Sequence, residues 1–417
     1  MDADLVVIGA GALGLSTALH AALLGRRPVV VERHTAGSQA SGRAAGLFKS
    51  VQADELRTRL ARRSIDLALT FPDWAGGELV VTRSGSFLIA RTDQHKTYLQ
   101  TEARQSALWG VDVRAAQPGE LASRLSYYRG DGHEYALWCP EDIYIEEPIS
   151  LIRAYLAAGR LHGVEVLESE AVTGVIVSGG RVTGVETTKR SIAAPVVVDA
   201  AGAWTRQVAE LAGGEVAVAP VRHQLLITEP ADAVSPADPI ARIVDAAVYL
   251  RPARAGLMAG AFEAAPLPLD PRAEASSFST DDVPLDIGVL QAMARHVARE
   301  VPMVSDAVMS NAAASDGAVT SAVAEHRGGL FTMTPDGRFV TGPAPDVPGL
   351  WVASGCNGSG FSSSLAIGEA LAGWICGQNP RVDISALSPG RFGPVTDEAL
   401  VKAGVWQYAH YYDPAAS

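Results

Sequence analysis

Residues 5–25 have the sequence LVVIGAGALGLSTALHAALLG. Its first four residues are an apolar run typical of a buried parallel strand, and the leucines that follow recur at helical spacing. A second apolar run, Val29–Val31, ends at Glu32. A strand, a glycine-rich turn, a helix and a second strand form a βαβ unit. The sequence therefore predicts an α/β domain built on a parallel sheet.

The turn of this unit has the pattern Gly-x-Gly-x-x-Gly, formed by Gly9, Gly11 and Gly14. The first glycine permits a tight turn, the second lets a pyrophosphate approach the backbone, and the third lets helix and strand pack closely. The helix N-terminus adds amide donors and positive partial charge. Glu32 follows Gly14 by 18 residues, where its carboxylate can bind ribose hydroxyls and would repel a 2′-phosphate. This stretch predicts a dinucleotide site, and NADP is not expected there.

The composition is that of a folded protein with an acidic surface. The chain has 417 residues, 48% of them hydrophobic and 19% charged, which suits two or three domains and excludes intrinsic disorder. A net charge of −12 argues against nucleic acid or an anionic membrane as partner. There is no apolar run long enough to span a membrane, and the acidic N-terminus is unlike a secretory signal. Three cysteines without metal-ligand spacing favour free thiols in the cytoplasm.

After residue 164 the chain changes to short strand-like segments separated by turns. These segments cover residues 164–167, 171–177, 182–187, 196–198, 219–228, 245–251 and 256–262. The first three predict a β-meander, and the last three predict an antiparallel sheet in a second domain.

A second glycine-rich turn, GCNGSGF at residues 355–361, precedes a predicted helix over 362–376. A plain NAD dehydrogenase would continue after Glu32 with alternating strands and helices, and would not need this late turn. A long flavin cofactor does need a distant closing segment. The N-terminus of the helix would face the flavin N1–C2=O edge, where negative charge develops on reduction. The late turn therefore favours FAD over NAD.

Four stretches, residues 5–32, 37–46, 196–204 and 330–371, together resemble the D-amino-acid oxidase-like (DAO) superfamily of FAD-dependent oxidoreductases. The resemblance is nearest to the sarcosine oxidase, glycine oxidase and dimethylglycine dehydrogenase groups. It implies a mixed α/β fold, with a Rossmann-like FAD-binding domain that carries a β-meander and a substrate domain on a large mixed antiparallel sheet.

The resemblance also implies a discontinuous division of the chain. Residues 1–50, 145–220 and 328–380 are expected to form the FAD-binding domain, residues 51–144 and 221–327 the substrate domain, and residues 381–417 a C-terminal tail. The tail contains the aromatic run WQYAHYY at 406–412. Three interpretations of this run stay open: it packs on its own domain, it covers the pocket, or it forms an oligomer interface.

The glycine motifs and the resemblance together assign the cofactor-binding residues. They are Gly9, Gly11, Ala12, Leu13, Gly14, Glu32, Arg33, Ser41, Arg43, Ala45, Gly46, Val172, Ala201, Gly202, Trp204, Gly355, Asn357, Gly358, Ser359, Gly360, Phe361 and Ser362. Non-covalent FAD is expected, because the flavin-linking cysteine of sarcosine oxidase corresponds to Gly329 and the flavin-linking histidine of dimethylglycine dehydrogenase corresponds to Arg43. No metal is expected.

The resemblance implies oxidation of the C–N bond of a small amine or of an N-alkyl or cyclic amino acid. A hydride passes to flavin N5 and an imine forms. The expected partners are this small molecule and O₂ or another electron acceptor, with no nucleic acid, no membrane insertion and an oligomeric state left open that includes a homo-oligomer. Two family lysines, one for substrate and one for oxygen, correspond to Ser362 and Met258. An oxidase and a dehydrogenase therefore both remain open.

Three residues are the candidates for substrate chemistry. Tyr249 matches an active-site tyrosine of the family, and Arg251 shares its face of the predicted strand. Arg251 is expected to hold a carboxylate with two parallel bonds, the alternative being a surface or domain-interface arginine. Lys49 lies where relatives place a carboxylate-binding arginine, the alternative being a solvated lysine. His223 is better explained as structural, although a histidine can also tune amine protonation.

Other classes of function stay open beside this one. They are a flavin monooxygenase or a hydroxy-acid oxidoreductase that acts on a specialised-pathway intermediate, and a non-catalytic FAD-binding protein. The late flavin segment reads ASGCN at 353–357 and lacks the Gly-Asp pair of aromatic hydroxylases, which speaks against the monooxygenase.

Overall fold

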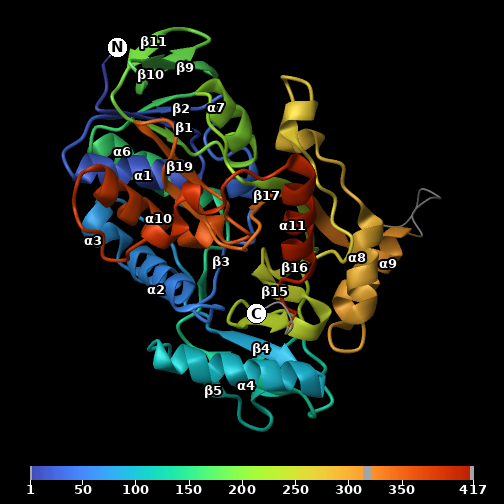
Figure 1. Ribbon diagram of the computed structural model, residues 1–417. Coiled ribbons are helices and arrows are strands. Elements are labelled where there is room, and N and C mark those ends of the chain that lie inside the picture. Colours follow the sequence, from blue (N-terminus) through green and yellow to red (C-terminus); the bar gives the residue numbers. More distant parts are fainter. Residues whose placement is uncertain (1, 313–321, 414–417) are drawn as a thin grey trace.

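The computed structural model describes residues 2–312 and 322–413, and two large sheets organise them (Figure 1). The helices are α1 (Ala12–Leu23), α2 (Glu55–Leu69), α3 (Phe71–Ala75), α4 (Asp93–Leu108), α5 (Glu120–Arg124), α6 (Ile149–Leu161), α7 (Thr205–Leu211), α8 (Ile287–His296), α9 (Pro302–Ala312), α10 (Gly360–Ile375) and α11 (Asp397–Ala409). Among the described residues, no helix is long and apolar enough to cross a membrane.

The first sheet has six strands in the order β18-β19-β12-β1-β2-β8. Their bounds are Leu5–Ile8 for β1, Pro28–Val31 for β2, Glu165–Leu167 for β8, Val197–Asp199 for β12, Val340–Pro343 for β18 and Leu350–Ser354 for β19. All neighbours are parallel except β18 and β19. This is the Rossmann-like sheet that the sequence predicts, and that prediction is confirmed.

Both faces of this sheet are buried, which explains why its strands are apolar throughout. On β1, Leu5 and Val7 pack with the helices α1, α2, α6 and α10. Val6 and Ile8 point the other way, onto α7 and the three-stranded sheet of β9 (Val172–Ser178), β10 (Arg181–Thr187) and β11 (Ser191–Ala193). The alternation follows from the two-residue period of a strand.

One detail of the predicted meander is wrong. The sequence predicts residues 164–167 as its first strand, but β8 pairs parallel with β2 and extends the first sheet. The reason is that β8 directly follows α6, which packs beside α1, so the chain re-enters the sheet in the parallel direction. The three strands of the meander are instead β9, β10 and β11.

The second sheet is large and mixed, with eight strands in the order β17-β13-β16-β15-β14-β4-β6-β5. The bounds are Ser86–Ala90 for β4, Arg114–Ala115 for β5, Tyr135–Cys139 for β6, Ala219–Thr228 for β13, Ile240–Ile243 for β14, Val248–Ala253 for β15, Gly256–Ala261 for β16 and Val323–Met333 for β17. Only β14 and β4 run parallel. A further pair, β3 (Leu47–Phe48) with β7 (Ile143–Tyr144), links the two sheets in sequence.

Two helices set the position of the site. Both α1, which follows β1, and α10, which follows β19, begin at the carboxyl end of the parallel sheet, where such folds bind ligands. They cross closely at Gly368, where a Cβ atom would lie 2.2 Å from Ser16 Oγ. Glycine at the crossing therefore lets the two N-termini face the same space.

The C-terminal segment returns to the second sheet. Figure 1 shows α11, in red, beside β17, and the helix also contacts β13. Tyr408 of this helix packs with Val221 of β13 and Met333 of β17. Gly404 allows the close approach, because a Cβ atom there would lie 3.0 Å from Ala219 Cβ.

Candidate active site

A cavity of about 510 Å³ extends from the carboxyl ends of β1 and β2 to the face of the eight-stranded sheet. This volume lies in the range of sites for small molecules and cofactors, about 300–1,000 Å³. Its walls come from both sheets, from the two glycine-rich turns and from the end of α11. One end is therefore built like a dinucleotide site and the other like a substrate site.

At the dinucleotide end, the backbone of the first turn is exposed to the cavity. Gly9 has a φ of +105° and leaves no room for a side chain, since a Cβ atom would lie 2.5 Å from the carbonyl oxygen of Ala200. A Cβ at Gly14 would lie 2.0 Å from the carbonyl oxygen of Gly9. At Gly11, which lines the cavity, the nearest atom would be Ser41 Oγ at 3.1 Å. These are the roles that a bound pyrophosphate requires of the three positions.

Glu32 is a fixed carboxylate at the end of β2. Its Oε2 accepts the backbone N–H of Ala10 at 2.8 Å, and its Oε1 accepts that of His34 at 2.8 Å. The residue is buried but lines the cavity. Two backbone bonds use only part of the capacity of a carboxylate, which has about four lone-pair sites. The remaining sites can accept ribose hydroxyls.

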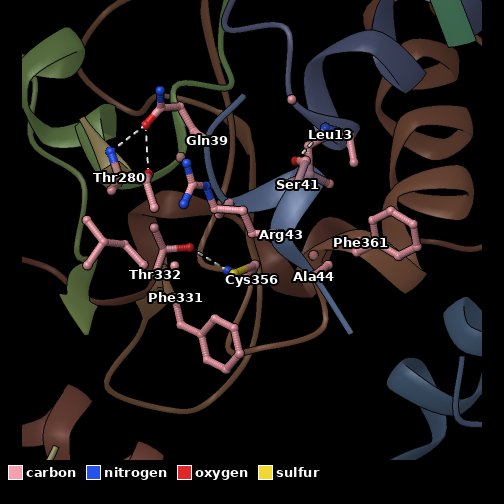
Figure 2. Close-up of a pocket in the computed structure, with 18 of the residues that line it drawn as sticks. Leu13, Gln39, Ser41, Arg43, Ala44, Thr280, Phe331, Thr332, Cys356 and Phe361 are labelled. Atoms are coloured by element: carbon pink, nitrogen blue, oxygen red, sulfur yellow. Dashed lines mark hydrogen bonds between the residues drawn. The ribbon is translucent and has the colours of Figure 1, made fainter. Parts of the chain in front are cut away.

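Residues 276–284, in the connection between β16 and α8, form a strap at this end of the cavity. Gln39 Oε1 accepts the N–H of Thr280 at 2.8 Å and its hydroxyl at 2.7 Å (Figure 2). Beside them, Arg43 forms an ion pair with Asp281. Arg33 lies over the ring of Trp204, 4.8 Å from its centroid. These contacts hold the strap against the loop that follows β2.

The second glycine-rich turn leads into α10. Residues 359–362 line the cavity, and the N-cap Ser359 makes no side-chain cap. The N-cap of α1, Gly11, has no side chain, and of the first amides of this helix that of Ala12 donates to Ser41 Oγ at 3.0 Å. Both helices therefore direct positive partial charge into the cavity. Cys356 N–H donates to Thr332 Oγ1 at 2.8 Å, which fixes the start of the turn (Figure 2).

Most residues predicted to bind the cofactor line this cavity. They are Gly9, Gly11, Ala12, Leu13, Glu32, Arg33, Ser41, Arg43, Ala45, Gly46, Val172, Ala201, Gly202, Trp204, Gly358, Ser359, Gly360, Phe361 and Ser362. Gly14, Gly355 and Asn357 lie behind its wall. Gly14 packs against Gly9, whereas Asn357 shapes the late turn by accepting Thr334 N–H at 2.9 Å and donating to the carbonyl of Gly355 at 2.7 Å.

At the other end, a histidine joins two tyrosines. His223 Nδ1 lies 2.6 Å from the Tyr408 hydroxyl, and Nε2 lies 2.8 Å from the Tyr249 hydroxyl. Burial lowers the pKa of His223 to about 3. The imidazole is therefore neutral at physiological pH, so one of its nitrogens donates and the other accepts. Both His223 and Tyr249 line the cavity.

Aromatic rings form much of the wall near this group. Phe331 stacks on His223 with ring centroids 4.3 Å apart, and Tyr411 stacks on Phe262 at 4.1 Å. Tyr412 meets Phe262 edge-on at 5.7 Å. All four rings line the cavity. The interpretation in which the C-terminal run covers the pocket is the one that the structure supports.

Three cations reach the cavity at this end. Arg242 is paired with the fully buried Asp142 at 3.0 Å, and Arg327 bonds the carbonyl of Ala44 at 3.1 Å. Lys49 differs from both, because its Nζ lies over the ring of Tyr412, 5.6 Å from the centroid, and has no carboxylate within 4.0 Å among the described residues. Lys49 is therefore the cation best able to accept an anion from outside.

The assignment of Arg251 to a substrate carboxylate is wrong. Arg251 is fully buried and does not line the cavity. Its guanidinium donates to the carbonyls of Ala45 at 2.8 Å, Pro252 at 2.7 Å and Glu146 at 2.7 Å. Burial lowers its pKa to about 10. Its donors are used to hold the loop that carries Ala45 and Gly46, which is the interface alternative.

Sequence reasoning missed several wall residues. They are Arg242, Phe262, Thr280, Arg327, Phe331 and Thr332, and His223 was placed among structural residues. Each lies on a strand or loop of the second sheet without a local motif. The one available signal was strand alternation, which puts Phe331 two residues after Gly329 on the same face of β17.

The fold and the cavity define a class: a dinucleotide-dependent protein whose second sheet supplies a small-molecule site. The FAD dependent oxidoreductase family (DAO) matches residues 4–374, so the chain belongs to this family of FAD-dependent oxidoreductases. The features of the dinucleotide end, above all the bare Gly11 and the two helix N-termini, fit FAD.

Similar proteins include mouse mitochondrial sarcosine dehydrogenase, 27% identical over 94% of this chain and 41% of that protein. The 4-methylaminobutanoate oxidase of Paenarthrobacter nicotinovorans is 28% identical over 93% of this chain and 45% of that protein. The chain thus spans less than half the length of these relatives. Glycine oxidase of Pseudomonas putida is 25% identical and is matched along its whole length.

Two solved structures show the same fold. L-proline dehydrogenase from P. horikoshii aligns with a TM-score of 0.81 and 21% identity, covering 94% of this chain and 98% of that one. Glycine oxidase from Geobacillus kaustophilus aligns with a TM-score of 0.78 and 21% identity, covering 94% and 100%. The predicted family and fold class are confirmed.

Proposed function

We propose that this FAD-dependent oxidoreductase oxidises the C–N bond of a small amino acid, N-alkyl amino acid or cyclic amine. The observation that carries the proposal is the substrate end of the cavity. There, the Lys49 ammonium, which has no carboxylate within 4.0 Å in residues 2–312 and 322–413, shares one space with a neutral His223–Tyr249 pair, aromatic walls and the dinucleotide end. When bound, FAD would supply the hydride acceptor for the C–H bond next to the amine nitrogen, and the imine product would hydrolyse.

Binding and orientation come from this chain's side chains. Lys49 pairs with the substrate carboxylate, which places the amine end among Tyr249, Phe262 and Phe331. Aromatic walls keep water away from the amine and favour its neutral form, the form from which a hydride can leave. Positioning contributes more to such a reaction than a strong base does.

The hydroxyl of Tyr249 is the polar group of the chain that faces the amine end. Neutral His223 cannot act as a cation near pH 7, because its pKa is about 3. The role of His223 is instead to hold the Tyr249 hydroxyl, at 2.8 Å, in a fixed orientation toward the cavity. Burial also raises the pKa of Tyr249, so this hydroxyl keeps its proton and donates a hydrogen bond.

The test is anaerobic mixing of the FAD-loaded protein with amino acids, N-methyl amino acids and cyclic imino acids, followed by flavin absorbance. Bleaching by members of one class is expected, and readmitting air then separates an oxidase from a dehydrogenase. If dithionite reduces the flavin but no amine does, the proposal is wrong.

We propose that FAD is held without a covalent bond. Gly329 has no side chain to attach, and Arg43 is engaged with Asp281. Acid precipitation of the holoenzyme should leave the yellow colour in the supernatant. A yellow pellet after washing would contradict this.

We propose O₂ or a second redox partner as the electron acceptor. We also propose the cytoplasm as the location, since all three cysteines are free. Reoxidation rates in air and fractionation of the source cells test the two points separately.

A further inference from the structure

The C-terminal run of aromatic residues contributes to the cavity although it lies far along the chain from the rest of the site. Tyr411 and Tyr412 follow the end of α11 and line the cavity beside Phe262. Tyr408, within α11, is fully buried and reaches His223. Three residues of the segment thus meet the substrate end, two directly and one through a histidine.

The segment is anchored, as a binding wall has to be. At the start of α11, Thr396 Oγ1 accepts the N–H of Ala399 at 3.3 Å, and Asp397 pairs with Arg206 and Arg272. Near its end, Gln407 Nε2 donates to the carbonyl of Pro335 at 3.1 Å. Helix capping and these contacts hold the tyrosines at one depth in the cavity.

The hydrogen bond between Tyr408 and His223 can set the tautomer of the imidazole. The Tyr408 hydroxyl lies 2.6 Å from Nδ1, where it can donate its proton. A neutral imidazole that accepts at Nδ1 must carry its proton at Nε2 and donate it to Tyr249. The hydroxyl proton of Tyr249 is then free to point into the cavity.

Tyr411 and Tyr412 limit the space between Phe262 and the ammonium of Lys49. Tyr411 lies flat on Phe262, with an interplanar angle of 9°, and Tyr412 meets Tyr411 edge-on with centroids 4.9 Å apart. Lys49 lies over Tyr412. A substrate whose carboxylate is paired with Lys49 therefore places its substituents against these two rings.

We propose that the C-terminal segment 396–412 completes the substrate site. Tyr411 and Tyr412 are specificity-determining residues that select carboxylate-bearing amines with a compact apolar or cyclic substituent. Tyr408 is a positioning residue that sets the tautomer of His223. The proposal rests on the proposed amine oxidation and adds a size limit and a proton arrangement to it.

The size limit is tested with Tyr411→Ala and Tyr412→Ala, with Trp406→Ala as the matched control. Trp406 lies on the same helix, is 44% exposed and stacks on His410 rather than lining the cavity. The substrates are proline, N-methylglycine, N-ethylglycine and N-benzylglycine, and the readout is the rate of anaerobic flavin reduction. Removing a ring should shift the ratio of large to small substrates by about tenfold or more. Ratios within twofold of the wild type for both variants would overturn the proposal.

The positioning role is tested with Tyr408→Phe, which keeps the ring and removes the hydroxyl. In the wild-type background the flavin reduction rate should fall about tenfold, with substrate affinity little changed. In a Tyr249→Phe background the same change should have less than a twofold effect, because both hydroxyls act through one chain of hydrogen bonds. Equal losses in both backgrounds would show a merely structural role and overturn this part.

A second experiment tests the size limit even if the proposed function fails. If no amine reduces the wild-type flavin, the wild type, Tyr411→Ala, Tyr412→Ala and Trp406→Ala are titrated with propionate, benzoate and 2-naphthoate. The flavin difference spectrum then reports binding. The segment then still predicts that Tyr411→Ala and Tyr412→Ala improve binding of naphthoate relative to propionate by about tenfold. Unchanged relative affinities would overturn the inference independently of turnover.

Discussion

The two ends of the cavity are built on different principles. The dinucleotide end is made mainly of backbone, with bare glycines, two helix N-termini and one fixed carboxylate, Glu32. The substrate end is made of side chains such as His223, Phe262 and Tyr411 that come from separate strands and from α11. The comparison teaches that cofactor binding is encoded in short contiguous motifs, whereas substrate choice is encoded in residues that only the fold brings together.

The largest effect is expected at the dinucleotide end. Gly11→Val places two methyl groups where the pyrophosphate must approach the backbone, so the purified protein should contain no FAD. Absorbance near 450 nm relative to 280 nm measures the content. Gly77→Val is the control, since a Cβ atom there meets nothing closer than 3.6 Å and the residue does not line the cavity. Full FAD content in Gly11→Val would contradict the backbone-built site.

Replacing Arg251, behind the cavity wall, should change stability, whereas replacing Lys49, in the cavity, should change substrate binding. Arg251→Met leaves three carbonyl oxygens without their buried donor, which should lower the free energy of unfolding by about 3 kcal/mol or more. Lys49→Gln should leave that stability unchanged and raise KM for a carboxylate substrate by about tenfold to a hundredfold. Denaturant unfolding and steady-state kinetics measure the two. A rise of KM caused by an otherwise stable Arg251→Met would return Arg251 to the site.

The pH dependence of the free energy of unfolding should show that His223 is uncharged in the folded protein. The folded pKa of His223, about 3, is below the unfolded value near 6.5. Between these values the unfolded chain binds the proton and the folded chain does not, so stability falls as pH drops below 6.5 and is unaffected above it. Between pH 6 and 4, the free energy of unfolding of His223→Gln should fall by about 1 kcal/mol less per pH unit than that of the wild type. Parallel pH curves would show that the histidine is charged in the folded protein.

The smallest effect is expected at the strap. The Arg43–Asp281 pair is solvent-exposed on the aspartate side, and such pairs contribute about 0.2–1 kcal/mol. Asp281→Asn should therefore accelerate FAD release less than about fivefold, as followed by flavin fluorescence. Gln39→Ala, which removes two less exposed bonds to Thr280, should accelerate it more. The reverse order would show that the ion pair, rather than the amide, closes the strap.

The sequence was sufficient for the parallel sheet and the family, and most residues that it predicts to bind the cofactor line the cavity. Gly9 to Glu32 and Gly355 to Ser362 are local patterns, which explains this agreement. The sequence failed where tertiary structure decides. Strand alternation put Tyr249 and Arg251 on one face, but the loops at Ala45 and Glu146 cover Arg251 and leave Tyr249 open.

Other residues carried no pattern that could reveal their place. Phe262 and Arg242 lie in or next to strands without a distinctive motif. Residues 164–167 join the parallel sheet instead of the meander, because α6 directly precedes them. The aromatic run at 406–412 was visible, but only the packing of α11 on β13 and β17 directs Tyr411 and Tyr412 into the cavity.

We propose that one cavity holds FAD at its backbone-built end and an amine with its carboxylate at the other. A crystal structure of the FAD-loaded protein with pyrrole-2-carboxylate tests this arrangement. We predict FAD along the wall from Glu32 to Ser362, with the carboxylate paired to Lys49 and the ring beside Tyr249 and Tyr411. A carboxylate bound elsewhere, with Lys49 left in solvent, would contradict the proposed role of Lys49 and of this end of the cavity.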